Sequence, residues 1–219
     1  MPQVKDEGGQ SVPPPADEGT QAVRTPSDEG GRAQPSAKRA DARRNYEHLL
    51  SVAADCFAEH GTAASLRDVA RRADVGIGTL YRHFPTREAL LEAVLNQRFE
   101  QLRRRADALA ATASPATALR AWLGEFAVGS AAYKGLPEEM MGALNDADSQ
   151  LHASCAAMRA AGARLLESAQ DAGAIRADIT AGELLALAAG LAWAGEHAPD
   201  PAGFVDKLLS ITMAGLEPA

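Results

Sequence analysis

A chain of 219 residues, of which 46% are hydrophobic, has room for one or two globular domains, and it contains no apolar run of the roughly 18 residues that a membrane span requires. Its polar, Pro- and Gly-rich start is unlike a secretory signal, so we expect a cytoplasmic protein. The net charge of −7 is unevenly distributed, because residues 38–110 carry 13 Lys and Arg against 10 Asp and Glu while both flanking parts are acidic.

Residues 1–37 are predicted to form a disordered acidic tail. They contain many Pro, Gly, Ser and Gln but few large apolar residues, a composition that does not offset the entropy lost on folding. An Asp-Glu-Gly triplet recurs in the tail at Asp6, Asp17 and Asp28. Duplication of low-complexity sequence explains this repeat, and competition of the tail with DNA for the basic section is the alternative.

From Lys38 onward the chain shows the pattern of successive helices. Between Leu49 and Phe57 apolar residues recur at three- and four-residue spacing, which is typical of one buried helix face. Further helix starts and ends are indicated by Gly61, Ser65 with Asp68, Ser114-Pro115, Gly173, Thr180 with Glu183, and Asp200-Pro201. We therefore expect an all-α fold of about nine helices, near residues 39–60, 65–72, 76–83, 86–111, 115–132, 137–144, 148–172, 180–197 and 201–217.

Residues 65–84, with the sequence SLRDVARRADVGIGTLYRHF, predict two short helices around a turn at residues 73–76. Their inner faces are expected to consist of Leu66, Val69 and Ala70 in the first helix and Ile77, Leu80 and Phe84 in the second. Because helices this short are unstable alone, both must pack against the longer helix before them.

The outer face of the second short helix suits the major groove of DNA. It consists of Gly78, Thr79, Tyr81, Arg82 and His83. Glycine allows close approach of the backbone, hydroxyl groups donate to phosphate oxygens, and Arg or protonated His adds positive charge. Nearby basic residues are Arg67, Arg71 and Arg72 in the preceding helix, Arg87 at the start of the next, and a cluster of Lys38, Arg39, Arg43 and Arg44.

The segment from about Asn45 to Leu95, including FAEHG and SLRDVARRADVGIGTLYRHFPTREALLEAV, resembles the DNA-binding domain of the TetR family of regulators. The resemblance implies that helix 76–83 is the recognition helix. It also implies that Thr79, Tyr81 and His83 contact phosphates or base edges, that Gly78 permits close approach, and that Arg67 and Arg87 reach the DNA backbone. The corresponding domains are a helix-turn-helix domain over 38–85 and a ligand-binding and dimerisation domain over 86–219.

Two positions depart from the family pattern. Asp74 stands where glycine is common in the turn, and Asp tolerates a left-handed backbone at modest cost. Gly76 stands where a serine cap is common, so one capping hydroxyl is missing. Packing of Tyr81 against the scaffold and a purely surface role for His83 remain alternatives, and Arg103–Arg105 are interpreted as a solvated face or a domain linkage.

No catalytic motif follows residue 111, since the chain lacks a nucleophile elbow, a His-Glu-x-x-His motif and a Gly-rich phosphate loop. We therefore expect no enzyme, no cofactor and, with five scattered histidines, no metal site. Cys56 and Cys155 are expected to be free thiols packed as small apolar residues.

The second half is rich in alanine, with a few bulky or polarisable side chains that are candidates for lining a pocket between helices. The candidates are Trp122, Phe126, Tyr133, Met141, Cys155, Met158, Trp193 and His197. Ordinary core packing is the alternative for each of them. The ligand we expect is a small apolar or aromatic effector.

The helices near 180–197 and 201–217 are apolar on more than one face, which favours burial against a second subunit. The stretch LLESAQDAGAIRADITAGELL also resembles the ligand-binding domain of a TetR subgroup, and in the family the terminal helices form a four-helix dimer interface. The leading hypothesis is a homodimeric repressor of double-stranded operator DNA, with half-sites about 34 Å apart.

In this hypothesis an effector tilts the fourth helix and weakens DNA binding, for which a preference of about 1–3 kcal/mol suffices. The alternatives are an activator, a DNA-compacting architectural protein, and an enzyme or carrier with the same fold.

Overall fold

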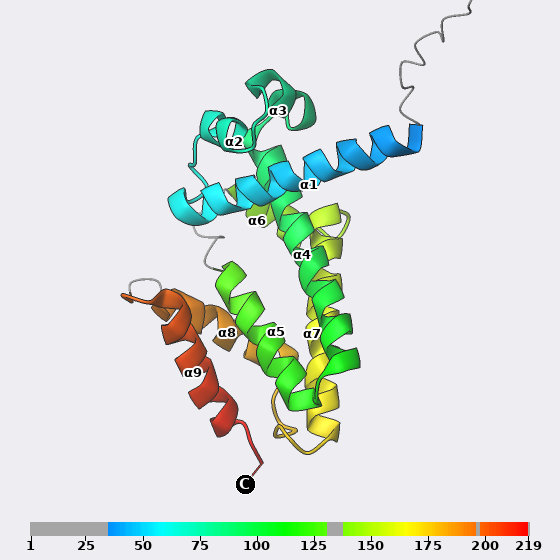
Figure 1. The fold of residues 1–219 in the computed structure, drawn as a ribbon. Coiled ribbons are helices and arrows are strands. Elements are labelled where there is room, and N and C mark those ends of the chain that lie inside the picture. The colour runs from blue at the N-terminus through cyan, green and yellow to red at the C-terminus, as the bar shows by residue number, and fades with distance from the viewer. Residues whose placement is uncertain (1–34, 131–137, 196–197, 219) are drawn as a thin grey trace, which may run out of the picture.

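The computed structural model describes residues 35–130, 138–195 and 198–218, and this part of the chain contains helices and no strand (Figure 1). The helices are α1 (Pro35–His60), α2 (Leu66–Arg72), α3 (Ile77–His83), α4 (Arg87–Thr112), α5 (Pro115–Ser130), α6 (Glu138–Asn145), α7 (Gln150–Asp171), α8 (Ala181–Gly195) and α9 (Pro201–Gly215). The all-α prediction is confirmed, and α1 begins four residues earlier than expected. The predicted acidic tail lies almost entirely outside the described residues.

The capping residues expected from the sequence lie at the ends of the observed helices. Thr180 and Glu183 form a reciprocal capping box, because the Thr180 N–H donates to Glu183 Oε2 at 2.8 Å and the Glu183 N–H donates to Thr180 Oγ1 at 3.3 Å. Asp200 caps α9 by accepting a hydrogen bond from the Gly203 N–H. Gly61 and Gly173, which follow the ends of α1 and α7, have φ angles of 69° and 65°, a left-handed conformation that glycine adopts without strain.

The long helix α4 connects the two ends of the molecule (Figure 1). One end consists of α1, α2 and α3, and α4 packs against α1 there. Farther along, α4 packs against α5 and α7, while α8 and α9 lie against α5. Most buried residues of these helices form one continuous core that joins both ends of the molecule, and Ala127, Ala192 and Val205 form a small separate cluster.

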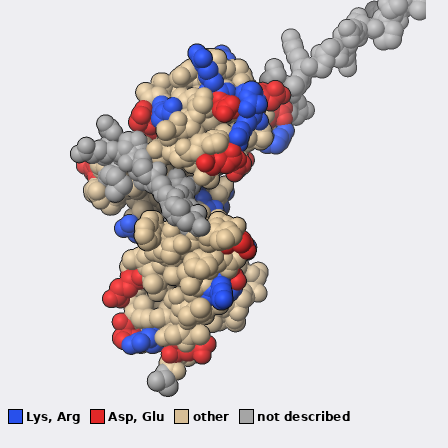
Figure 2. Space-filling view, turned by 90° about the vertical axis from the view of Figure 1, so that its left-hand side faces the viewer, with Lys and Arg blue, Asp and Glu red and all other residues tan. Residues whose placement is uncertain are grey.

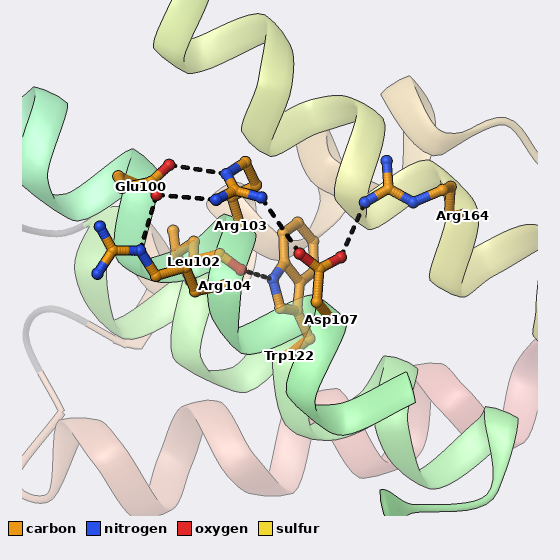
Figure 3. Close-up of polar contacts among 7 residues, drawn as sticks. All are labelled: Glu100, Leu102, Arg103, Arg104, Asp107, Trp122 and Arg164. Atoms are coloured by element: carbon orange, nitrogen blue, oxygen red, sulfur yellow. Dashed lines mark hydrogen bonds and ion pairs between the residues drawn. The ribbon is translucent and has the colours of Figure 1, made fainter. Parts of the chain in front are cut away.

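Trp122 lies at the crossing of α4, α5 and α7 (Figure 3). Its side chain is 1% exposed, and the indole Nε1 donates to the backbone carbonyl of Leu102 in α4 at 2.8 Å. The ring lies against Gly162 of α7, where an added Cβ would approach the ring atom Cζ3 to 2.6 Å. The absence of a side chain at Gly162 is therefore what lets the indole fit between the helices.

Ion pairs join α4 to its neighbours beside this crossing (Figure 3). Arg103 donates to Glu100 at 2.7 Å, and Glu100 also accepts from Arg104 at 2.7 Å. Asp107 accepts from Arg103 at 3.2 Å and from Arg164 of α7 at 3.0 Å. Among the described residues, Arg103 and Arg104 pair only within α4, and the link to α7 is made by Asp107 with Arg164.

None of the helices within the described ranges has the length and apolar character needed to cross a membrane.

Replacing Gly162 with alanine is expected to destabilise the protein by about 1–3 kcal/mol, because the added methyl group overpacks the buried Trp122 ring. The free energy of unfolding from urea titration measures this change. Gly142→Ala is the matched control, since a Cβ there meets nothing within 4 Å and alanine favours a helix. Equal stability of the two variants would contradict the account of the crossing.

Lowering the pH should weaken the contribution of Glu100 to the folding stability of the protein. Hydrogen bonds from Arg103 and Arg104 lower the pKa of Glu100 from 4.5 to about 2, so the folded chain binds this proton less readily than the unfolded chain. The stabilisation is present above pH 4.5 and is lost as the pH falls through about 2. We expect the stability difference between the native protein and Glu100→Gln to shrink over this interval. A difference that is constant with pH would show that the ion pairs contribute nothing.

Candidate functional site

The turn between α2 and α3 sets the position of the second short helix. Ser65 caps α2 by accepting from the Asp68 N–H at 3.4 Å, and the Val75 N–H donates to the Ala70 carbonyl at 2.9 Å. Asp74 has a φ of 53° and so takes up the left-handed conformation expected of it. Gly76 precedes α3 and provides no side-chain cap, also as expected.

Burial of one side of α3 determines which residues face outward. Leu80 and Phe84 are buried, as predicted for the inner face. Ile77 is 38% exposed, so its assignment to the inner face is wrong. Ile77 is the first residue of α3, and Leu80, one turn later, is the residue of this helix that is buried.

The outer face of α3 presents the residues that the sequence places there. Gly78, Tyr81, Arg82 and His83 are exposed, and Thr79 is half-buried. Arg82 Nη2 donates to Thr79 Oγ1 at 2.9 Å, which fixes the hydroxyl beside the guanidinium group. Two hydroxyls, a guanidinium and an imidazole thus lie on one short helix, a set that can donate to phosphate oxygens and to base edges.

A residue that the sequence analysis did not select lies against this face. Tyr46 of α1 packs edge-on against His83, with ring centroids 6.0 Å apart, and contacts Phe84 at 5.6 Å. Tyr46 therefore positions His83 from outside α3. Its spacing of three residues from the buried Leu49 is the signal that could have identified it.

The basic residues around α3 differ in how they are paired. Arg43 donates to Glu47 and Arg44 to Asp41, both within α1, and Arg71 donates to Asp68 within α2. Arg72 joins α2 to α1 through Glu59 at 2.7 Å. Among the described residues, Arg67 and Arg82 have no carboxylate partner. Figure 2 shows Lys and Arg side chains gathered at this end of the molecule, with acidic groups among them.

Arg87 has a different environment from the other predicted DNA contacts. It stands at the start of α4, is half-buried, and donates through Nη1 to the carbonyls of Thr62 and Ala64, the former at 3.0 Å. The guanidinium thus fastens α4 to the loop that follows α1. The side chains of Lys38 and Arg39 lie outside the described part of the structure.

Five of the predicted pocket residues have described side chains. Trp122, Cys155 and Met158 are buried in the core, and the half-buried Phe126 stacks on Trp122 with ring centroids 5.9 Å apart. Trp193 points away from this group, with 71% of its surface exposed. The side chains of Tyr133, Met141 and His197 are outside the described residues.

The two thiols have ordinary structural settings. Cys56 and Cys155 are free and buried, as predicted, and burial raises the pKa of both thiols. Within the described ranges, no three His, Cys, Asp or Glu side chains gather closely enough to hold a metal ion.

The chain is similar to known regulators along most of its length. The family model of bacterial regulatory proteins of the tetR family matches residues 49–94, and the model of the SbtR-like transcriptional regulator C-terminal domain matches residues 114–218. Among curated proteins, the repressor KstR of Mycolicibacterium smegmatis is 38% identical over 71 residues, which is 32% of this chain and 33% of that protein. An HTH-type transcriptional repressor of Mycobacterium tuberculosis is 49% identical over 49 residues, 22% of this chain and 26% of that protein. The match thus spans about a third or less of these curated relatives.

Two solved structures extend the similarity to nearly whole chains. A TetR transcriptional regulator from Streptomyces coelicolor is 35% identical with a TM-score of 0.67, covering 79% of this chain and 98% of that one. A TetR regulatory protein from Mycobacterium vanbaalenii is 32% identical with a TM-score of 0.62, covering 83% and 99%. With this fold, this outer face of α3 and these relatives, the chain belongs to the TetR family of DNA-binding transcriptional regulators.

Proposed function

We propose that the protein is a homodimeric repressor that binds a near-palindromic operator and is released from it by a small-molecule effector. The observation that carries this proposal is the outer face of α3, where Thr79, Tyr81, Arg82 and His83 lie together above a buried anchor of Leu80 and Phe84. The names of two similar proteins, both repressors, favour repression over activation.

The proposed docking of α3 in the major groove of DNA follows from the length of this helix and from the hydrogen-bond donors on its outer face. A helix of seven residues fits the major groove, with the exposed Gly78 allowing the backbone to come close. Arg67 and Arg82, which lack carboxylate partners within the described ranges, are free to bind phosphates at once. Arg43 and Arg44 pair only with exposed carboxylates of their own helix, so exchange of these partners for phosphate costs little.

Dimerisation is supported by exposed apolar side chains on α8 and α9. These are Leu187, Trp193, Phe204 and Ile211. On the side where α8 and α9 lie in Figure 1, the lower part of Figure 2 shows a broad surface with few charged groups. A self-complementary patch of this kind produces a twofold dimer, and two copies of α3 about 34 Å apart would reach successive major grooves.

Coupling to an effector would pass through α4. This helix begins at the end of the DNA-binding half, where Arg87 holds it to the loop after α1, and it ends between α5 and α7. A ligand that prefers one tilt of α4 by about 1–3 kcal/mol would change the spacing of the two α3 helices and lower operator affinity.

Genomic DNA fragments selected by the purified protein at near-physiological salt are expected to share a narrow set of near-palindromic sites. Tyr81→Ala should lose these sites, because the variant removes an exposed hydroxyl and ring from the outer face of α3. Arg159→Ala, an exposed change on α7, should keep them. Recovery of fragments without any common sequence would favour an architectural protein instead.

Salt dependence provides a second measurement on the same surface. The slope of log affinity against log salt concentration should be about one unit smaller for Arg82→Ala than for the native protein, since one phosphate contact is lost. Arg159→Ala should leave the slope unchanged. If the slopes of all three proteins agree, Arg82 makes no phosphate contact.

Ile211→Glu is expected to convert the dimer to a monomer in light-scattering measurements, because it places a charge in the apolar face of α9. Ile211 is 61% exposed in the single chain, so the variant should still fold. Val128→Glu is the matched control on α5, with a comparable exposure of 62% outside that face. A dimer that survives Ile211→Glu but not Val128→Glu would place the interface elsewhere.

A further inference from the structure

A groove of about 430 Å³ opens between α4, α5 and α9. Its apolar surface comes from Gly124 and Val128 of α5 and from Val205 and Leu209 of α9, and its basic groups are Arg98 of α4 and Arg120 of α5. We call it the α4–α5–α9 groove. Its volume lies in the range of small-molecule sites, and none of the predicted pocket residues with described side chains lines it.

The carboxylates of this groove are already paired. Glu125 accepts from Arg105 at 2.7 Å, and Asp206 accepts from Arg120 at 2.7 Å. Arg120 also donates to the Ser210 hydroxyl at 2.8 Å. Neither acidic group is therefore left to neutralise a further cation.

Arg98 is the exception among the charged groups of the groove. Its Nη2 donates to the backbone carbonyl of Glu125, and its Nε is buried without a hydrogen-bond partner. Within the described ranges no carboxylate pairs with this guanidinium. The buried Nε is closed to a ligand, but a guanidinium charge without a carboxylate partner binds a carboxylate through charge-assisted hydrogen bonds from its remaining donors.

From this combination we propose that the α4–α5–α9 groove binds an amphipathic organic carboxylate. The carboxylate occupies the position beside Arg98, with Arg120 exchanging Asp206 for the same anion. The alkyl or aryl body lies along Val128, Val205 and Leu209. One unpaired cation above an apolar surface favours a single negative charge on a hydrophobic body over a neutral or multiply charged ligand.

The groove stays open in the dimer proposed above. α9 turns Val205 and Leu209 toward α5, where both are buried, while Phe204 and Ile211 are exposed on its other side. The identification of this carboxylate with the effector rests on the proposed function, whereas binding of the carboxylate does not.

Binding of sodium octanoate and of 3-phenylpropanoate to the full chain, measured by calorimetry without DNA, tests the site. We expect at least one carboxylate to bind, octan-1-ol to bind more weakly than octanoate, and Arg98→Met to raise the Kd of the bound carboxylate about tenfold or more. Arg159→Met, an exposed arginine on α7, should leave the Kd unchanged. Circular dichroism of each variant checks that the helices are retained.

Val128 offers a second pair of variants that does not disturb the core, since it is 62% exposed. Val128→Asp should weaken octanoate binding by charge repulsion, and Val128→Lys should keep or strengthen it. The proposal is overturned if neither carboxylate binds, if octan-1-ol binds as tightly as octanoate, or if Arg98→Met and the Val128 pair leave the Kd unchanged. Operator binding with and without octanoate is measured separately, so that failure of the release step is distinguishable from failure of the site.

Discussion

The surface proposed to contact DNA depends on the burial of two helices that are each only seven residues long. Helices of this length do not persist alone in water, so α2 and α3 keep their shape because Val69, Leu80 and Phe84 are buried in the core they share with the longer helices. The left-handed Asp74 sets the angle between them, and Arg87 ties the following helix to the loop before α2. The outer face of α3 is therefore fixed before any DNA arrives, and little conformational entropy remains to be lost on binding.

Electrostatics explain how an acidic chain presents a surface for a polyanion. The net charge of −7 resides largely outside the DNA-binding half. Within that half, most arginines near α3 pair with carboxylates three or four residues away or on the adjacent helix, whereas Arg67 and Arg82 lack such partners in the described structure and Arg87 donates to backbone carbonyls. Exposed pairs contribute little to stability and exchange readily, so phosphate competes for them at small cost. In the proposed function, local pairing of this kind would restrain indiscriminate attraction to DNA and leave Arg67 and Arg82 for immediate contact.

Periodicity and capping residues predicted the helices well, since the signals at Ser65, Thr180 and Asp200 are local and act within one turn. They also predicted the outer face of α3, apart from Ile77. Sequence could not separate Trp122 from Trp193, because α5 and α8 are apolar on several faces and only packing decides which face is covered. One ring is buried and the other is exposed. The contacts of Arg87 and Arg98 could not be predicted for a related reason. Their acceptors are backbone carbonyls that come near these side chains only after the chain folds.

The hydrogen bond from Trp122 to Leu102 has a mechanical consequence for α4. It joins the C-terminal half of this helix to α5 and α7, so that part moves with them as one block. Arg98, one turn before Leu102, is also held to α5 through the Glu125 carbonyl, so a swing of the other half of the molecule would pivot on the N-terminal side of Arg98. The stretch from Arg87 to Arg98 would then be a lever arm about 16 Å long, at a rise of about 1.5 Å per residue. A rotation of about 7° at the pivot would move the far end by about 2 Å, so a small rearrangement beside the crossing would become a larger displacement of α3.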